Sequence, residues 1–158
     1  MDDAVKKEAL RLFTYGLYAV SVEADGVRNA FTANWLSQVS FDPPMIALSI
    51  ENDSASLPLA RASGRFVVNV YDTEQRELAG RLGKPLSRSP DKLADVALEA
   101  TPSGQPYLRD ALAWVEVAIE REAPAGDSTL LIGQVVDVGM LRRAEPLTMR
   151  ASGFRHAG

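Results

Sequence analysis

The chain lacks cysteine altogether and contains one histidine, His156, among its 158 residues. Without thiols it has no means to form disulfides, ligate iron–sulfur clusters or bind zinc through cysteine. One histidine near the end of the chain supplies too few ligands for a histidine-based metal site, and it is a poor general base for the serines. We therefore predict no metal site and no catalytic side-chain set. Any redox chemistry of this chain requires an organic cofactor.

Long hydrophobic runs and basic clusters are also missing. The longest apolar runs, such as residues 45–48, are far too short to span a bilayer, and residues 1–13 are too charged for a signal peptide. Asp and Glu (21) outnumber Lys and Arg (17), and the formal charge of −4 argues against nucleic acid as a partner. No Walker-type or G-x-G-x-x-G loop is present. We expect a cytoplasmic protein that binds neither membranes nor nucleic acid.

Hydrophobic alternation typical of β-strands is the main pattern of the chain. Tyr18, Val20 and Val22 alternate with smaller residues, and Asp25-Gly26 then predicts a hairpin turn that leads into residues 27–35. Further strands are expected over residues 45–50, 66–71, 111–122 and 129–141. Short helices are expected from Asp2 to about Phe13 and over residues 57–62 and 73–82, whereas residues 84–110 are mostly loops. No repeat or linker divides the chain, so residues 1–158 are expected to form one domain, an antiparallel β-barrel with peripheral helices.

The segment from Phe31 to Pro44 departs from plain strand alternation. Small polar residues stand between large apolar ones, and the segment ends in an Asp-Pro-Pro corner. Hydroxyls and an amide on an apolar strand suit a flat ligand with hydrogen-bonding edges, a description that a flavin fits. A hairpin whose polar residues face solvent is the alternative interpretation, and residue types alone do not separate the two.

The polar loop over residues 51–56 precedes a predicted short helix. The hydroxyls of Ser54 and Ser56, together with the free N–H groups of that helix, could bind a phosphate. Plain capping of the helix is the alternative interpretation. Arg81 follows a later helix and could add positive charge to the same phosphate.

Two carboxylates, Glu116 and Glu120, share one face of a predicted strand. The opposite face carries Val115, Val117 and Ile119. We expect the two glutamates to lie on a solvated face rather than to form an acid/base pair.

Four stretches, in this order and spacing, together carry a resemblance to a known family. They are Thr14-Tyr15-Gly16-Leu17-Tyr18, residues 29–44, residues 63–70 and residues 125–135. From about Leu10 to its end the chain resembles the flavin reductase-like, FMN-binding split β-barrel family. The nearest look-alikes are flavoredoxin-type proteins and the flavin domain of high-molecular-weight rubredoxins. The resemblance implies an antiparallel split barrel, a homodimer, and FMN (or FAD) bound near the subunit interface.

The resemblance also implies functional residues. Those expected along the flavin ring are Thr32, Ala33, Asn34, Trp35 and Ser40. Those expected near the phosphate are Asp53, Ser54, Ser56 and Arg81. A reduced nicotinamide, NADH or NADPH, would be contacted by the tail residues Phe154, Arg155 and His156, and by Ser128.

Two departures from the family pattern bear on function. Many of its reductases have histidine where this chain has Ser128, and that histidine is associated with nicotinamide binding. Trp35 replaces a smaller residue and could either stack on the flavin or fill the barrel mouth. The resemblance implies an NAD(P)H-dependent flavin reductase that passes electrons to free flavin, a partner oxygenase or a small redox protein. A flavoredoxin-like FMN carrier with little direct NAD(P)H activity is the alternative, and a barrel that has lost its cofactor is a third.

Overall fold

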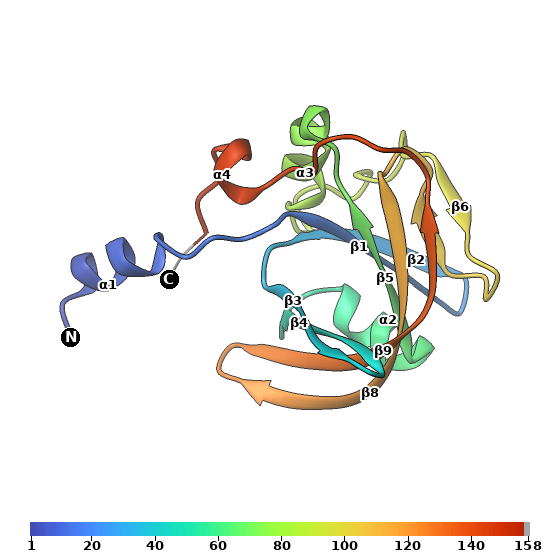
Figure 1. Ribbon diagram of the computed structural model, residues 1–158, viewed down its shortest axis with the longest axis horizontal. Helices are drawn as coiled ribbons and strands as arrows, with labels where there is room; N and C mark the ends of the chain where they lie inside the picture. Colours follow the sequence, from blue (N-terminus) through green and yellow to red (C-terminus); the bar gives the residue numbers. More distant parts are fainter. Residues whose placement is uncertain (157–158) are drawn as a thin grey trace.

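One antiparallel sheet of seven strands dominates the computed structural model, which describes residues 1–156 (Figure 1). The strand order is β2-β1-β5-β8-β9-β4-β3. The elements in chain order are α1 (Asp3–Leu10), β1 (Tyr18–Ala24), β2 (Val27–Ala33), β3 (Leu36–Phe41), β4 (Pro44–Glu51), α2 (Ser56–Ser63), β5 (Arg65–Val70), the 3-10 helix η1 (Thr73–Gln75), α3 (Arg76–Leu82), β6 (Leu98–Ala100), β7 (Pro106–Leu108), β8 (Ala113–Ala125), β9 (Ser128–Met140) and α4 (Met149–Ser152). The prediction of a mainly β, antiparallel fold with short helices is confirmed.

The sheet has an open seam between its first and last strands. β2 and β3 form its two edges, yet only Asn34 and Trp35 separate them along the chain. Within the described residues no ladder joins these two strands. Asn34 and Trp35 therefore lie at the seam, and the carbonyl oxygen of Trp35 accepts a hydrogen bond from the backbone N–H of Ser49 at 3.0 Å.

The hairpin of β1 and β2 forms at the turn that the sequence predicts. Asp25 and Gly26 both adopt positive φ angles, 53° and 77°, and Ala24 pairs with Val27 across them. Two positive φ angles match the right-handed twist of paired strands. The turn thereby fixes the register in which Thr32 lies opposite Ala19.

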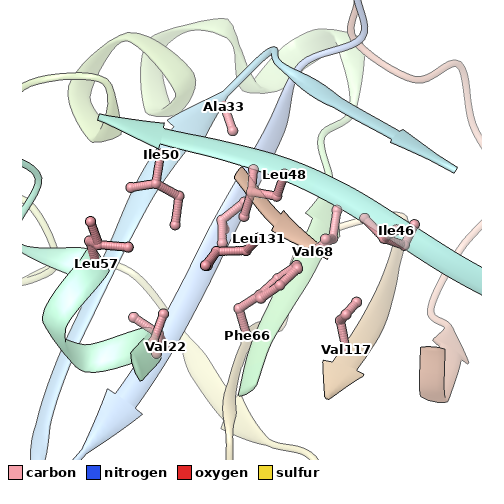
Figure 2. Close-up of a cluster of buried hydrophobic side chains, with 12 residues drawn as sticks. Val22, Ala33, Ile46, Leu48, Ile50, Leu57, Phe66, Val68, Val117 and Leu131 are labelled. Atoms are coloured by element: carbon pink, nitrogen blue, oxygen red, sulfur yellow. The ribbon is translucent and has the colours of Figure 1, made fainter. Parts of the chain in front are cut away.

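An apolar cluster fills the space between the curled sheet and α2 (Figure 2). Phe66, Val22 and Leu48 are at most 1% exposed, and Leu57 of α2 packs among them. Burial of one such side chain stabilises the fold by roughly 1.5–3 kcal/mol. Ala33, the last residue of β2, belongs to this cluster.

A second apolar cluster lies on the other face of the β1–β2 hairpin, beneath α3. Ala79 and Leu82 of α3 pack with Ala19 and Ala30, and all four are at most 1% exposed. Because side chains alternate along a strand, neighbouring residues of β1 and β2 face opposite clusters. Helices α2 and α3 therefore cover opposite faces of this hairpin.

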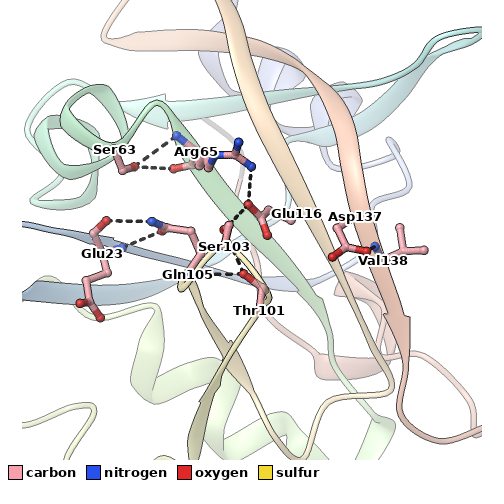
Figure 3. Close-up of polar contacts among 9 residues, drawn as sticks. All are labelled: Glu23, Ser63, Arg65, Thr101, Ser103, Gln105, Glu116, Asp137 and Val138. Atoms are coloured by element: carbon pink, nitrogen blue, oxygen red, sulfur yellow. Dashed lines mark hydrogen bonds and ion pairs between the residues drawn. The ribbon is translucent and has the colours of Figure 1, made fainter.

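Glu116 is buried, which contradicts the expectation of a solvated carboxylate. Its carboxylate accepts hydrogen bonds from Arg65 Nη1 and Ser103 Oγ, both at 2.6 Å (Figure 3). Burial alone would raise the pKa of Glu116, but hydrogen bonds from Ser103, Thr101 and Arg65 outweigh it and hold the pKa below its ordinary value. Glu120 on the same strand is exposed, as expected. Glu116 is a structural anchor between β5, β8 and the 101–105 loop.

Several short elements were not anticipated, namely β3, β6, β7 and α4. The residues of β3 between its two ends are all exposed, except the half-buried Ser40, so β3 shows no apolar alternation. Helix α1 ends at Leu10 rather than near Phe13, and Asp2 caps its start as predicted. No helix within residues 1–156 combines the length and the apolar character that crossing a bilayer requires.

Candidate functional site

Two residues of the predicted ring-binding segment turn their side chains into the protein. Thr32 Oγ1 donates to the carbonyl oxygen of Ala79 at 2.6 Å and lies 2.9 Å from the hydroxyl of Tyr71. Burial raises the pKa of Tyr71 well above its ordinary value, so the phenol stays neutral. Ala33 faces the first apolar cluster. The side chains of Thr32 and Ala33 therefore support the segment, and the main chain of the edge strand β2 is left for a ligand.

Asn34 offers the clearest indication of a missing partner. Its Nδ2 atom is buried and has no hydrogen-bond partner among the described residues. A buried amide donor without a partner costs about 1–3 kcal/mol. Such a donor at the open seam of the sheet fits a ligand whose edge carries hydrogen-bond acceptors, as the edge of a flavin does.

Trp35 lies against the C-terminal tail. The centroids of its indole and of the His156 ring are 4.9 Å apart, with the ring planes at 75°. The structure thus joins a predicted ring-binding residue to a predicted nicotinamide-binding residue that lies 121 positions later in the sequence. Arg155 is exposed beside this contact.

Phe154 fixes the tail on α3. The guanidinium carbon of Arg76 lies 5.0 Å from the centre of the Phe154 ring, and Arg76 Nε donates to the carbonyl oxygen of Ser152. Gly80 lies against the same ring, because a Cβ atom at this position would come within 3.2 Å of it. Phe154 is therefore a packing residue of the tail as well as a candidate binding residue.

In the predicted phosphate loop, the hydroxyl of Ser56 forms a hydrogen bond inside the protein. Ser56 is buried, and its Oγ accepts a hydrogen bond from Asn29 Nδ2 at 2.9 Å. Ser54 is half-buried, and its Oγ accepts the backbone N–H of Ser56 at 3.3 Å. Asp53 is exposed, and its carboxylate would repel a phosphate, so only its backbone suits that role. Helix α2 starts after Ala55, which has no capping side chain.

Ser128 lies beside this loop and not beside the tail. It pairs with Glu51, and the backbone N–H of Asn52 donates to the carbonyl oxygen of Asp127 at 2.9 Å. Ser128 is 2% exposed, and its hydroxyl donates to Asp127 Oδ1. Within one chain the structure therefore splits the predicted nicotinamide residues into two places.

Arg81 and the Ser54 loop are likewise separate within one chain. Arg81 belongs to α3 and the loop leads into α2, and these helices cover opposite faces of the β1–β2 hairpin. The Nε atom of Arg81 is buried without a partner among the described residues, whereas its Nη1 lies 3.9 Å from Asp95 Oδ2. Ser40 is half-buried on β3, opposite Met45.

Sequence reasoning assigned no role to the residues between α1 and β1. Tyr15 accepts a hydrogen bond at its carbonyl oxygen from the backbone N–H of Met149, at 3.0 Å, so this connection lies against the tail. The stretch Thr14-Tyr15-Gly16-Leu17-Tyr18 carried part of the resemblance, which was the one available signal.

Comparisons with known proteins identify the family of this chain. The family model described as "Flavin reductase like domain" matches residues 10–158. The high molecular weight rubredoxin of Moorella thermoacetica is 34% identical over 143 residues, which are 89% of this chain and 62% of that protein. A ferric-chelate reductase (NAD(P)H) of Archaeoglobus fulgidus is 32% identical over 143 residues, covering 89% of this chain and 85% of the relative.

The fold has close counterparts among solved structures. Flavin reductase PheA2 in its native state superposes with a TM-score of 0.83 at 30% identity, covering 99% of this chain and 98% of that one. The chain spans 62% of the rubredoxin's length and about a quarter of the length of several diflavin flavoproteins that it also matches. Over residues 10–158, therefore, the chain belongs to the flavin reductase-like domain family.

Proposed function

We propose that this protein is an NAD(P)H-dependent flavin reductase that binds FMN at the open seam of its sheet. The observation that carries the proposal is the buried, unpartnered Nδ2 donor of Asn34, placed beside Trp35 in a chain of this family. FMN, when bound, supplies the chemistry, because a flavin accepts a hydride and releases electrons to an acceptor. The residues of this chain bind and orient the flavin and limit its exposure to water.

Each candidate residue has a distinct part in the proposed site. Asn34 donates to an acceptor on the ring edge, while the main chain of Thr32 and Ala33 and the Ser40 region border the ring. Trp35 and the tail residues Phe154, Arg155 and His156 cover the ring and exclude water. The loop of Asp53, Ser54 and Ser56 provides backbone N–H donors and the Ser54 hydroxyl to the phosphate. Arg81 provides positive charge on the α3 side.

The division of these residues between two faces favours a homodimer. Ser128 and the Ser54 loop do not meet Arg81 or the tail within one chain, so a second copy would complete the site. The outer part of β9 offers an interface, because Val136, Val138 and Met140 are 45%, 60% and 66% exposed. The pairing of β9 with β4 ends at Gln134, which leaves an unpaired strand edge beside these side chains. Exposed apolar side chains that share one strand typically mark an interaction surface.

A flavoredoxin-like carrier of electrons remains the second candidate, and Ser128 favours it. Its hydroxyl is buried and donates to Asp127, so it does not substitute for an imidazole in contacting a nicotinamide. Such a carrier would be reduced by a partner protein rather than by NAD(P)H. In the reductase, electrons would pass to free flavin, a partner oxygenase or a small redox protein. FAD could replace FMN, and the protein would act in the cytoplasm.

Anaerobic reduction of the FMN-loaded protein distinguishes the two candidates. Purified protein is loaded with FMN, and NADH or NADPH is added while flavin absorbance is followed, with free FMN as the control. Bleaching much faster than that of free FMN supports the reductase. Flavin that is bleached by dithionite but inert to both nicotinamides selects the carrier. Absence of saturable FMN binding would remove both.

A further inference from the structure

Lys92 is only 2% exposed, although a lysine side chain is almost never fully buried unless it is paired. Its Nζ atom donates to the carbonyl oxygens of Leu82 at 3.2 Å and of Lys84 at 3.0 Å. Within residues 1–156 Lys92 forms no ion pair at 4.0 Å or less. The fold therefore keeps this ammonium inside the protein at a cost in solvation, with carbonyl groups as its hydrogen-bond partners.

The two carbonyl groups that Lys92 binds lie at the end of α3, directly after Arg81. Leu82 is the last residue of the helix, and Arg81 is the basic residue of its last turn. The last carbonyl groups of a helix have no partner within the helix and form the negative end of its dipole. This end would repel any anion that Arg81 binds. The Lys92 ammonium offsets that charge, and its two hydrogen bonds fix the main chain that follows Arg81.

Asp95, three residues after Lys92, contacts the side chain of Arg81. Its Oδ2 atom lies 3.9 Å from Arg81 Nη1, which is beyond hydrogen-bonding distance, and its side chain is 87% exposed. Ion pairs of this kind are weak. Both residues line a hollow of about 120 Å³ beside α3, and Arg81 Nε is buried without a partner among the described residues. The guanidinium of Arg81 is therefore incompletely paired, although its main chain is fixed.

Packing holds Lys92 and Asp95 in place beside α3. Residues 91–95 form turns, and the backbone N–H of Val96 donates to the carbonyl oxygen of Leu93 at 3.1 Å. The side chains of Leu93 and Val96 pack against the apolar cluster beneath α3. Because this contact anchors the turns, Lys92 and Asp95 approach the end of the helix from fixed positions.

We propose that residues 92–95 set the affinity of Arg81 for a phosphate group, with Lys92 as a positioning residue and Asp95 as the counter-ion that the phosphate displaces. The proposal rests on the proposed function, in which Arg81 lies near the phosphate of FMN. A dianionic phosphate binds a guanidinium more strongly than a single exposed carboxylate does. Neither Lys92 nor Asp95 needs to touch the flavin. Both would govern the preference for FMN over riboflavin, because these ligands share one ring system and differ by the phosphate.

The ratio of FMN affinity to riboflavin affinity tests the role of Lys92. Both ligands are titrated into the full-length apoprotein, and binding is followed by quenching of flavin fluorescence. Lys92→Met keeps the apolar stem and removes the ammonium, and it should lower the ratio about threefold to tenfold by weakening FMN binding alone. Lys84→Met removes the same charge from an exposed position after the same helix and should keep the wild-type ratio. A purely structural role of Lys92 would instead weaken both ligands equally and leave the ratio unchanged.

Asp95→Asn tests the counter-ion at an exposed position, where the substitution does not endanger folding. We expect it to raise the ratio about twofold, opposite in direction to Lys92→Met, because the phosphate no longer displaces a carboxylate. Asp91→Asn, exposed in the same segment and without an ion pair in the described part of the chain, is the matched control.

The outcomes separate this proposal from the proposed function. FMN binding with a wild-type ratio in either folded variant, or an equal change in its control, overturns the proposal and leaves the proposed function intact. If Lys92→Met does not fold, Asp95→Asn decides. A wild-type protein that binds neither FMN nor riboflavin would overturn the proposed function and this proposal together.

Discussion

Replacing Asn34 by alanine should leave the unfolding free energy of the apoprotein unchanged or higher, and it should weaken flavin binding. Most truncations of partly buried residues destabilise a protein. Asn34 differs because its Nδ2 donor is buried without a partner, so the fold pays for its desolvation without a hydrogen bond in return. A residue kept under such a cost is expected where a ligand supplies the missing partner.

The magnitude follows from two opposing effects. Removing the unpartnered amide relieves a cost of about 1–3 kcal/mol, and the loss of packing around the side chain offsets part of this gain. We expect Asn34→Ala to leave the unfolding free energy of the apoprotein unchanged or to raise it by up to about 1 kcal/mol. FMN binding should weaken about tenfold, since one hydrogen bond of about 1.4 kcal/mol is lost from the complex.

Asn69 provides a matched control within the same sheet. It is fully buried like the Asn34 donor, but its Nδ2 donates to Ala19 O at 3.0 Å and Ser21 Oγ at 2.9 Å, and its Oδ1 accepts Leu108 N at 2.7 Å. Asn69→Ala leaves these groups unsatisfied and should destabilise the apoprotein by about 2–4 kcal/mol. Replacement by alanine should therefore lower the unfolding free energy at Asn69 and leave it unchanged or raise it at Asn34.

Urea unfolding of the apoprotein, followed by tryptophan fluorescence, measures both stabilities, and quenching of flavin fluorescence measures FMN affinity. The reasoning is refuted if Asn34→Ala destabilises the apoprotein by more than about 1 kcal/mol, because Asn34 would then be satisfied in the fold. It is equally refuted if the variant binds FMN as tightly as the wild type.

Three further predictions address the fold and the assembly. Glu116→Gln should lower stability by about 2 kcal/mol at neutral pH. Because the native pKa of Glu116 lies below its ordinary value of 4.5, this contribution is present above about pH 4.5 and is lost as the pH falls through the native pKa, which pH-dependent unfolding will show. Gly133→Ala should cost about 3 kcal/mol, since the new Cβ would lie 2.3 Å from Ala118 O, and thermal unfolding will measure the loss. Met140→Asp should shift the proposed dimer toward monomer in sedimentation, because it places a charge in the exposed apolar row of β9.

Each of these has an outcome that would contradict it. Glu120→Gln, on the same strand but exposed, should change stability little. A loss of stability equal to that of Glu116→Gln would contradict the structural role of Glu116. An unchanged unfolding midpoint for Gly133→Ala would mean that β8 and β9 separate easily. A wild-type protein that sediments as a monomer would remove the dimer and the interface together.

The strands that alternate clearly were predictable from the sequence, and the ones that do not alternate were not. Val20, Val22, Phe66 and Val68 face one cluster, so local periodicity sufficed to identify β1 and β5. Strand β3 lies at a sheet edge with both faces largely exposed, and no pattern of burial marks it.

Partners that are distant in the sequence explain what remained unpredictable about the site. From the sequence alone, the carboxylate of Glu116 was expected to be solvated. The structure shows that Arg65, 51 residues earlier, lies beside it. The contact of His156 with Trp35 was not predicted, because the resemblance assigned His156 to the nicotinamide and Trp35 to the flavin ring. The separation of Arg81 from Ser54 depends on which face of the hairpin each helix covers. Residue types suggested the chemistry, and the three-dimensional arrangement decided which groups meet.

The contacts of α3 imply that ligand affinity is sensitive to residues that touch no ligand. The Thr32 hydroxyl holds the Ala79 carbonyl on one side of this helix, and the Phe154 ring rests on Gly80 one residue later. A displacement of that single turn would shift Thr32 of β2 and the Phe154 ring of the tail at the same time. Variation at Ala79 or Gly80 would therefore alter the proposed flavin site through the positions of Thr32 and Phe154.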